Sequence, residues 1–377
     1  MRINKIFIAL ILAFGFLSIL SFSSFEFARP ADGINDSLRK WYALPPSKWP
    51  KPTVDKGVNF EELGPLPSYP YPLDSNKVHL GKVLFFDARM SSSNLISCSS
   101  CHDPKLSWTD GLTFSIGHNK AVNTRNSPTI ENVWFYKQLF WDGRAKTLEE
   151  QAQIPLTSAI EMHQDMKVLP KKLKKIKGYK TLFINAFGDD EINNERIFKS
   201  IADFQRTIVS PESAFDRFLT GDTRSLSDEQ ILGLHLFRTK ARCMNCHYGP
   251  MFSDNEFHNL GLSNYGEKNQ DLGLYLTTKN PNDVGKFKTP SLRNVMSTGP
   301  WFHNGSVKTM DSLMLLYNMG MPFPAVTMAQ LDDPLLPKGD RLLKGIRLSK
   351  RELNALVAFL GALSAESNSF EKPKLPK

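Results

Sequence analysis

The four cysteines of this 377-residue chain form two Cys-x-x-Cys pairs, and a histidine follows each pair directly. Two thiols three residues apart on a short turn can form thioethers with the two vinyl groups of one haem. The next residue then lies beneath the iron, where an imidazole can bind it. The spacing therefore predicts two covalently attached c-type haems. The residues that would hold them are Cys98, Cys101 and His102 in the first motif, and Cys243, Cys246 and His247 in the second.

Three other uses of these cysteines are weighed against haem. Two structural disulfides are compatible with an exported protein. One zinc ion could use four thiolates, but the two pairs are far apart in the chain and each would carry an unneeded histidine. A thioredoxin-like redox pair would have to arise twice, each time with a histidine beside it. Haem attachment explains all six residues at once.

Helices that could deliver the chain to each haem precede both motifs. Residues 80–85 (Leu-Gly-Lys-Val-Leu-Phe) lie before the first motif, and residues 232–237 (Leu-Gly-Leu-His-Leu-Phe) lie before the second. The similarity of the two segments predicts two related haem units. The second helix has a capping box, in which a serine lies three residues before a glutamine, at residues 227–230.

Other periodic segments also indicate helices. Capping boxes begin helices at residues 147–150 and 349–352, and residues 195–209 place four apolar side chains on one face. Residues 171–180 read as one amphipathic, lysine-rich helix. Long alternating runs are absent from the sequence, and residues 261–290 read as a loop. The predicted fold is mainly α, with two cytochrome c-like haem domains and few strands.

The sequence also suggests boundaries between its parts. Arg2 and Lys5 precede an apolar run at residues 6–22, which is typical of an export signal or an N-terminal anchor. We expect a signal or anchor at residues 1–28, an extended proline-rich lead-in arm at 29–75, an N-terminal domain at 76–210, a C-terminal domain at 211–366 and a tail at 367–377. Export of a c-type haem protein predicts a periplasmic location.

The composition says less about partners. The net charge of +9 can steer an acidic protein partner, but it also fits an ordinary lysine-rich surface. Aromatic residues are not interleaved with the basic ones, so the sequence gives no support to nucleic-acid binding.

Several motifs together resemble the bacterial dihaem cytochrome c peroxidases, a superfamily that includes the methylamine dehydrogenase-maturation dihaem enzyme. The resemblance runs from about residue 76 to 365, in family order. Its motifs are residues 81–87, 97–103, 115–118, 125–129, 140–144, 289–294 and 302–306. It implies a peroxidatic N-terminal haem, an electron-storing C-terminal haem, and reduction of hydrogen peroxide to water.

The resemblance also implies roles for residues around the first haem. His118 matches a removable sixth ligand of its iron, and Glu161 matches the distal acid–base residue. A carboxyl group over an open iron could take a proton from the near peroxide oxygen and deliver one to the leaving oxygen. Gln151 could add a distal hydrogen bond. Trp141 matches a tryptophan between the two haems.

Three residues match an inter-haem calcium site of the family: Asn126, Thr298 and Pro300. One amide oxygen and two backbone carbonyls, completed by waters, suit a hard cation. The alternative for Asn126 is a turn residue without a metal. We expect one calcium ion in addition to the two haems.

The sixth ligand of the second haem is open between two side chains. Tyr317 falls on the ligand position when residues are counted without gaps, and Met319 lies two residues beyond. A thioether would raise the haem potential, whereas a phenolate would stabilise ferric and higher states. Tyr317 is preferred, and it resembles the maturation-type enzymes. Arg293 could pair with a haem propionate or form an ion pair elsewhere.

The leading prediction is therefore a dihaem c-type peroxidase that takes electrons from a small periplasmic cytochrome or a cupredoxin. One alternative is a maturation-type oxidase that acts on a partner protein. Another is a dihaem electron carrier with no substrate. The family also implies a possible homodimer.

Overall fold

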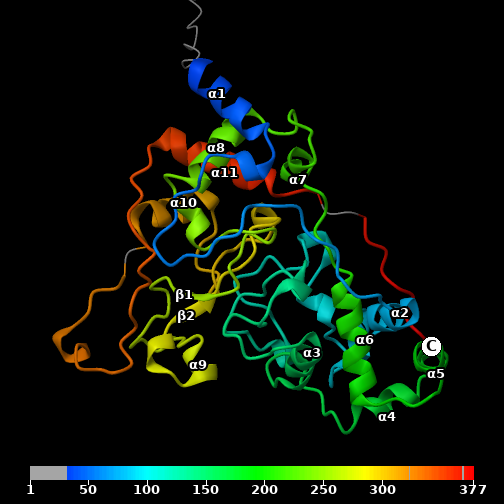
Figure 1. The fold of residues 1–377 in the computed structure, drawn as a ribbon. Helices are drawn as coiled ribbons and strands as arrows, with labels where there is room; N and C mark the ends of the chain where they lie inside the picture. The colour runs from blue at the N-terminus through cyan, green and yellow to red at the C-terminus, as the bar shows by residue number, and fades with distance from the viewer. Residues whose placement is uncertain (1–31, 322, 367–368) are drawn as a thin grey trace, which may run out of the picture.

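A computed structural model describes residues 32–321, 323–366 and 369–377 of the chain (Figure 1). The α-helices in these ranges are α1 (Asp32–Tyr42), α2 (Ser75–Phe86), α3 (Leu148–Thr157), α4 (Leu169–Lys174), α5 (Lys177–Phe187), α6 (Asn194–Arg206), α7 (Ala214–Leu219), α8 (Asp228–Arg238), α9 (Tyr275–Thr278), α10 (Met310–Met319) and α11 (Lys350–Ala362). One antiparallel pair, β1 (Phe257–Asn259) and β2 (Lys286–Lys288), is the only sheet in the part of the chain that is described. The predicted fold, mainly α with few strands, is confirmed.

Two crossed helix pairs organise the molecule, because α2 packs across α6 and α8 packs across α11. Each crossing depends on a glycine. A β-carbon on Gly81 would lie 1.8 Å from the carbonyl oxygen of Ser200, and one on Gly233 would lie 2.0 Å from that of Ala355. The two predicted repeat segments thus form equivalent helices in two related units.

Gly233→Ala should destabilise the protein by about 3 kcal/mol, because a methyl group cannot enter this crossing without moving a backbone. Gly361→Ala is the matched control, since Gly361 lies in α11, the helix that α8 crosses, and has no atom within 4 Å of its would-be β-carbon. That change should leave stability equal or raise it by up to about 1 kcal/mol. Chemical unfolding of the holoprotein followed by circular dichroism compares them. Equal effects of the two substitutions would contradict the close crossing.

The repeat continues beyond the helices into two five-residue loops. Leu139 bridges to Ala145 in the first unit, and Trp301 bridges to Val307 in the second. Both loops begin with a phenylalanine at positive φ, Phe140 and Phe302, and the next residues are Trp141 and His303. Trp141 and His303 are therefore structural equivalents.

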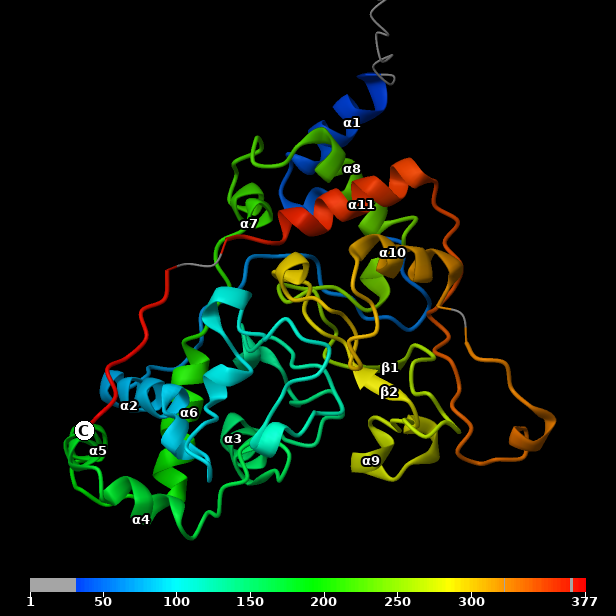
Figure 2. The ribbon, with the colours of Figure 1, turned by 180° about the vertical axis from the view of Figure 1, so that it is seen from behind.

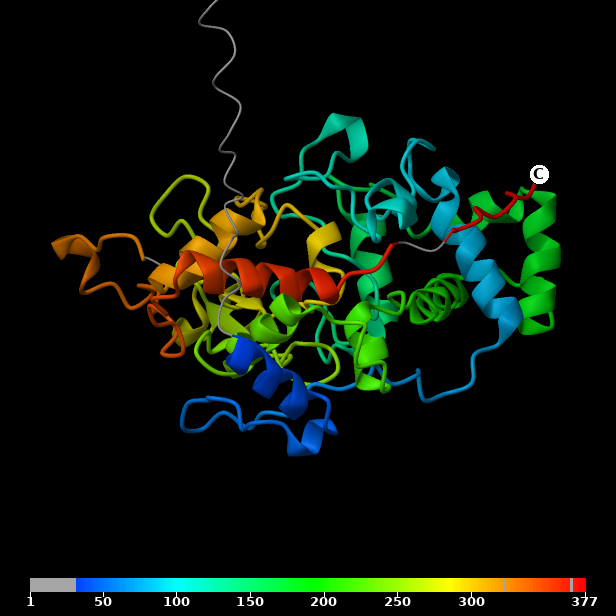
Figure 3. The ribbon, with the colours of Figure 1, turned by 90° about the horizontal axis from the view of Figure 1, so that it is seen from above.

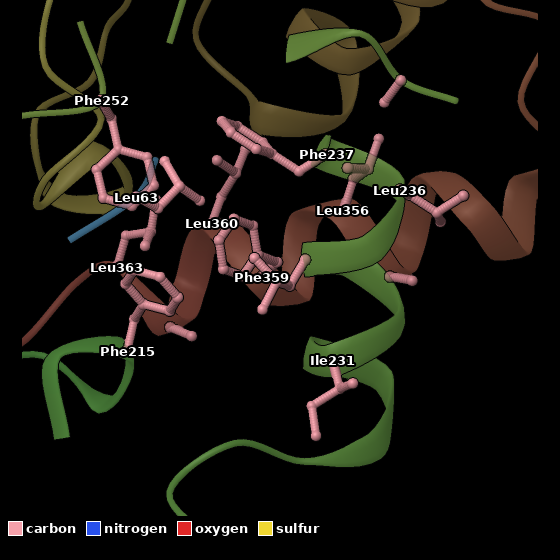
Figure 4. Close-up of a cluster of buried hydrophobic side chains, with 14 of the residues drawn as sticks. Leu63, Phe215, Ile231, Leu236, Phe237, Phe252, Leu356, Phe359, Leu360 and Leu363 are labelled. Atoms are coloured by element: carbon pink, nitrogen blue, oxygen red, sulfur yellow. The ribbon is translucent and has the colours of Figure 1, made fainter. Parts of the chain in front are cut away.

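Each unit has its own hydrophobic core. The first core gathers buried residues of α2, α3, α5 and α6, and the second gathers those of α8, α10 and α11. Figure 4 shows the second, where Phe215, Phe237, Phe252 and Phe359 meet edge to face. Ile208 belongs to the first core and Phe215 to the second. The chain therefore changes unit between these two residues.

The lead-in arm differs from the extended segment expected for residues 29–75. It starts with helix α1, which packs on α8 of the C-terminal unit. The fully buried Arg238 of α8 then holds the arm: its guanidinium donates to the Glu62 carboxylate and to the Pro50 carbonyl. The helix and these contacts place the arm in the second core, where Leu38 and Trp49 are buried.

The C-terminal tail leads from the C-terminal unit to the N-terminal unit (Figures 2 and 3). After α11 the chain runs back to the N-terminal unit, where Phe370 stacks on Phe86 with ring centroids 5.3 Å apart. The Lys377 carbonyl accepts a hydrogen bond from the Gly178 N–H at the start of α5. The N-terminal arm therefore packs on the C-terminal unit, and the C-terminal tail packs on the N-terminal unit.

Two further expectations have definite outcomes. The single helix expected at residues 171–180 is wrong, because the chain forms α4 and α5 with a break at Lys175 and Ile176. The long loop expected at 261–290 is interrupted by α9 and ends in β2. None of the helices in the described ranges is long and apolar enough to cross a membrane, and the apolar run at residues 6–22 lies outside those ranges.

Candidate functional site

Both Cys-x-x-Cys-His motifs face one cavity between the two units. The cavity measures about 300 Å³ and is lined by His102 of the first motif and by Cys243, Cys246 and His247 of the second. Most other lining side chains are apolar. An enclosed apolar space beside each motif suits the porphyrin faces of a haem.

The two histidines are prepared for iron in the same way. The Nδ1–H of His102 donates to the Trp108 carbonyl at 2.9 Å, and that of His247 donates to the Phe252 carbonyl at 2.8 Å. A carbonyl can only accept, so each ring is the tautomer whose Nε2 carries a free lone pair. This hydrogen bond to the far ring nitrogen is the usual support of a metal-bound histidine.

The cysteines fit haem better than the other uses. All four are free thiols in the structure, so the disulfide alternative has no support. Within the described ranges the two pairs do not converge on one metal site. The nearest group of potential ligands is Cys246, Asp254 and His258. A thioether link through Cys246 would remove its thiolate from that group.

Glu161 lies on the first haem side. Its charge acts on both Cys98 and Cys101, which places the carboxyl group near the first motif. Burial raises the pKa of Glu161, and the Arg144 guanidinium and a hydrogen bond from Asn123 offset this only in part. A raised pKa makes a carboxyl group better suited to take up and return a proton in acid–base catalysis.

His118 is held beside Glu161 but not in the cavity. Its backbone N–H donates to the Glu161 carbonyl at 2.8 Å, and its ring stacks on His163 at 4.7 Å. Gly117 allows this approach, since a β-carbon there would lie 2.1 Å from the Ile160 carbonyl oxygen. His118 is absent from the cavity lining. Its role as a ligand stays a prediction.

Gln151 and Trp141 both line the cavity. Gln151 on α3 accepts a hydrogen bond from the Gln205 amide at 3.2 Å. Trp141 donates from its indole nitrogen to the Asn126 carbonyl at 2.9 Å. Trp141 thus lines the same cavity as His102 and His247, and its position between the two haems stays a prediction.

Two backbone hydrogen bonds join the units at this point. The Asn126 N–H donates to the His303 carbonyl at 2.7 Å, and the Lys288 N–H donates to the Trp141 carbonyl at 2.9 Å. In each bond the donor is the residue before a Ser-Pro or Thr-Pro pair of one unit. The acceptor lies in the five-residue loop of the other unit. An ion pair between Arg125 and Asp271 adds a further tie.

The three residues predicted for calcium all line the cavity, and calcium binding there stays a prediction. Asn126 lines it from the first unit, and Thr298 and Pro300 line it from the second. Asn126 is buried, and its amide NH₂ donates to the Leu112 carbonyl at 2.8 Å. That bond directs the amide nitrogen away and leaves the amide oxygen for another partner.

The two candidates for the sixth ligand of the second haem differ in their exposure and in whether they line the cavity. Tyr317 on α10 lines the cavity, and burial followed by the charges of Cys246 and Cys243 raises its phenol pKa. None of the described residues hydrogen-bonds to its hydroxyl. Met319 is 55% exposed and does not line the cavity, whereas Met314 does.

Arg293 does not line the cavity, so its position does not favour the predicted contact with a haem propionate. The side chain is buried away from the cavity, where it donates to Asp216 at 2.9 Å and to the Pro250 carbonyl at 2.7 Å. The ion-pair alternative describes it better. Because Pro250 follows the second motif closely, Arg293 supports the loop that carries His247.

Sequence reasoning missed two charged cavity residues. His258 is held between Asp254 at 2.8 Å and Asp340 at 2.5 Å, which raise its pKa to about 12 despite burial. Lys288 lines the cavity from β2. Neither a lone histidine nor one lysine among many carries a local pattern that would have singled it out.

Comparison with known proteins agrees with this arrangement. The sequence model of the di-haem cytochrome c peroxidase family matches residues 75–224. The cytochrome-c peroxidase IdrP1 of Denitromonas iodatirespirans is 38% identical over 353 residues, which cover 85% of this chain and 91% of that protein. The methylamine utilization protein MauG of Methylophilus methylotrophus is 37% identical over 312 residues, covering 81% and 88%.

A solved structure is similar over nearly the same range. It is described as a MauG-like protein associated with microbial copper homeostasis. The TM-score is 0.70 at 30% identity, covering 84% of this chain and 97% of that one.

Proposed function

The chain belongs to the di-haem cytochrome c peroxidase family, and from that premise we propose that it reduces hydrogen peroxide to water with electrons from a small cytochrome c or cupredoxin. It is an oxidoreductase of the peroxidase class, and the family carries haem c. The balance is one peroxide, two protons and two electrons to two waters.

One observation carries the proposal. A single cavity joins His102, Trp141 and His247, and Glu161 lies at the first motif. An electron carrier needs neither a buried carboxyl group beside one haem nor an enclosed route to the other. A peroxidase needs both, because peroxide cleavage consumes protons at one site and electrons from two.

The haem irons, when bound, supply the redox chemistry of O–O cleavage. The chain's own residues handle the protons. The Glu161 carboxylate takes the proton from the near peroxide oxygen and returns it to the leaving oxygen, while Asn123 and Ser158 orient it by hydrogen bonds. Gln151, which lines the cavity, would add a hydrogen bond from its amide nitrogen.

Trp141 provides the electronic connection between the units. Its indole is fixed by the hydrogen bond to Asn126, and its carbonyl is held by Lys288 of the other unit. A rigid aromatic ring in the cavity shortens the gap that an electron must cross. With haem held by Cys243, Cys246 and His247 and by Cys98, Cys101 and His102, Trp141 would connect the C-terminal electron store to the N-terminal peroxide site.

Calcium, location and assembly complete the proposal. Asn126, Thr298 and Pro300 would bind one calcium ion, which the oxygen-rich donor set supports. Chelation that left the haem spectra unchanged would count against it. The two basic residues at positions 2 and 5, followed by the apolar run at residues 6–22, support export to the periplasm. A homodimer is carried over from the family.

Steady-state peroxide consumption tests the proposal. Reduced small cytochrome c should be oxidised at two molecules per peroxide by the haem-loaded protein. Apoprotein from a host without haem maturation is the control, and it should oxidise none. A loaded protein that consumed no peroxide with either a cytochrome or a cupredoxin donor would contradict the function.

A second candidate is favoured by Tyr317. A maturation-type enzyme oxidises side chains of a partner protein, and a phenolate ligand stabilises high oxidation states. The position of Tyr317 in the cavity supports such chemistry here. Oxidation of a partner protein by peroxide without turnover of a small donor would favour this candidate.

A further inference from the structure

Lys288 is a half-buried cation that has no anionic partner among the described residues. Its ammonium lies 3.7 Å from the Tyr136 ring centroid, and it donates one hydrogen bond, at 3.3 Å, to the Gln138 carbonyl. No ion pair joins it to any described carboxylate. An ammonium has three donors, so most of its hydrogen-bonding capacity is unused.

The nearest carboxylate is already occupied. Asp142 acts on Lys288 through its charge only, while its oxygens bind Arg125 at 2.6 Å and Arg144 at 2.9 Å. Burial lowers the pKa of Lys288 to about 7, and the charge of Asp142 offsets this only in part. Buried charges in proteins are normally paired.

The position of Lys288 indicates where the missing anion lies. Its side chain lines the cavity that both haem motifs share, and both of its contacts, Tyr136 and Gln138, belong to the N-terminal unit. Haem carries two propionates, which are the only carboxylates that a bound haem would bring into this apolar space.

The repeat gives a second, independent indication. Lys288 precedes Thr289 and Pro290, as Asn126 precedes Ser127 and Pro128 in the first unit. The two backbone N–H groups make equivalent bonds across the interface. Lys288 therefore occupies, in the second unit, the position from which Asn126 presents an amide oxygen. A fixed positive charge stands where the other unit has a neutral polar group.

We propose that Lys288 forms an ion pair with a propionate of the N-terminal haem, and that this pair sets the potential of that haem from a strand of the other unit. The pair would complete the hydrogen bonds of the ammonium and keep it charged. Because β2 also holds the Trp141 carbonyl through the Lys288 N–H, the same residue joins the electron path to the haem edge. This inference rests on the haem attachment in the proposed function, and not on peroxide as substrate.

Spectroelectrochemical titration of haem-loaded Lys288→Met tests the proposal. Loss of the positive charge should favour the ferric N-terminal haem about tenfold, which lowers its potential by about 59 mV, with a smaller change at the C-terminal haem. The propionate bending bands in resonance Raman spectra should shift as well. Lys288→Arg should restore both signals.

Lys286→Met is the matched control. Lys286 lies on the same strand and carries the same charge, but it pairs with Asp283 at 3.0 Å and does not line the cavity. It should leave both potentials and the propionate bands unchanged. If Lys288→Met loads no haem, Lys288→Gln, which removes the charge and keeps a polar side chain, serves the same comparison.

Two results would overturn the inference. One is equal potentials in the wild type, the Lys288 variants and the Lys286 control. The other is a shift confined to the C-terminal haem. Peroxide turnover is a separate readout: a wild type that shows the Lys288 effect but consumes no peroxide would remove the proposed function and leave the ion pair standing.

Discussion

Glu161→Gln is expected to lower the turnover of peroxide by a factor of roughly 10² to 10⁴ while both haems stay attached. General acid–base catalysis by one positioned side chain contributes about that much. The amide keeps the size of the carboxyl group and can keep its hydrogen bonds to Asn123 and Ser158, but it cannot carry the proton. Stopped-flow peroxide consumption with a reduced donor measures the loss, and the Soret band reports haem content.

Glu195→Gln is the control for this variant. Glu195 lies exposed on α6 of the same unit, and its substitution also replaces one carboxyl group by one amide. It should leave turnover unchanged. Near-normal turnover by Glu161→Gln would remove Glu161 from the mechanism, whatever the control does.

Tyr317→Met should change the second haem more than any other single substitution near it. A thioether in place of a phenol should raise the potential of the C-terminal haem by on the order of a hundred millivolts, because axial ligands move haem potentials over about 0.8 V. A near-infrared band typical of methionine bound to ferric haem should appear. Spectroelectrochemistry and near-infrared absorption of the oxidised protein are the measurements.

The methionines near Tyr317 provide the comparison. Met319→Leu should change neither signal, since Met319 is largely exposed. Met314→Leu removes one of the two methionines of α10 that line the cavity, the other being Met310 at the start of the helix. A methionine–iron band in the wild type that disappeared in Met314→Leu would show that Tyr317 is not the ligand.

Local rules in the sequence predicted much of this molecule. The Cys-x-x-Cys-His motifs are a local chemical pattern, and the structure gives both histidines the tautomer that iron requires. The capping boxes at Ser227 and Ser349 form as predicted, because their hydrogen bonds involve neighbours three residues apart. Gly81 and Gly233 marked a repeat because only glycine fits a close helix crossing.

Features that depend on distant contacts were not predicted. The arm at residues 29–75 reads as extended from its prolines, but Arg238, nearly two hundred residues away, holds it to the second core. Lys288 looks like any surface lysine until Tyr136 and Gln138 enclose it. The motif around Arg293 suggested a propionate partner, whereas Asp216 of α7 binds its guanidinium. Sequence spacing carries no information about such partners.

A single-turnover reaction tests the central claim most directly. Fully reduced, haem-loaded protein is mixed with one equivalent of hydrogen peroxide, and the two haems are followed by their separate absorption changes. We predict that all the peroxide is consumed and that each haem loses one electron, the N-terminal haem first. Consumption with no oxidation of the C-terminal haem, or no consumption at all, would contradict the division of labour between His102 and His247.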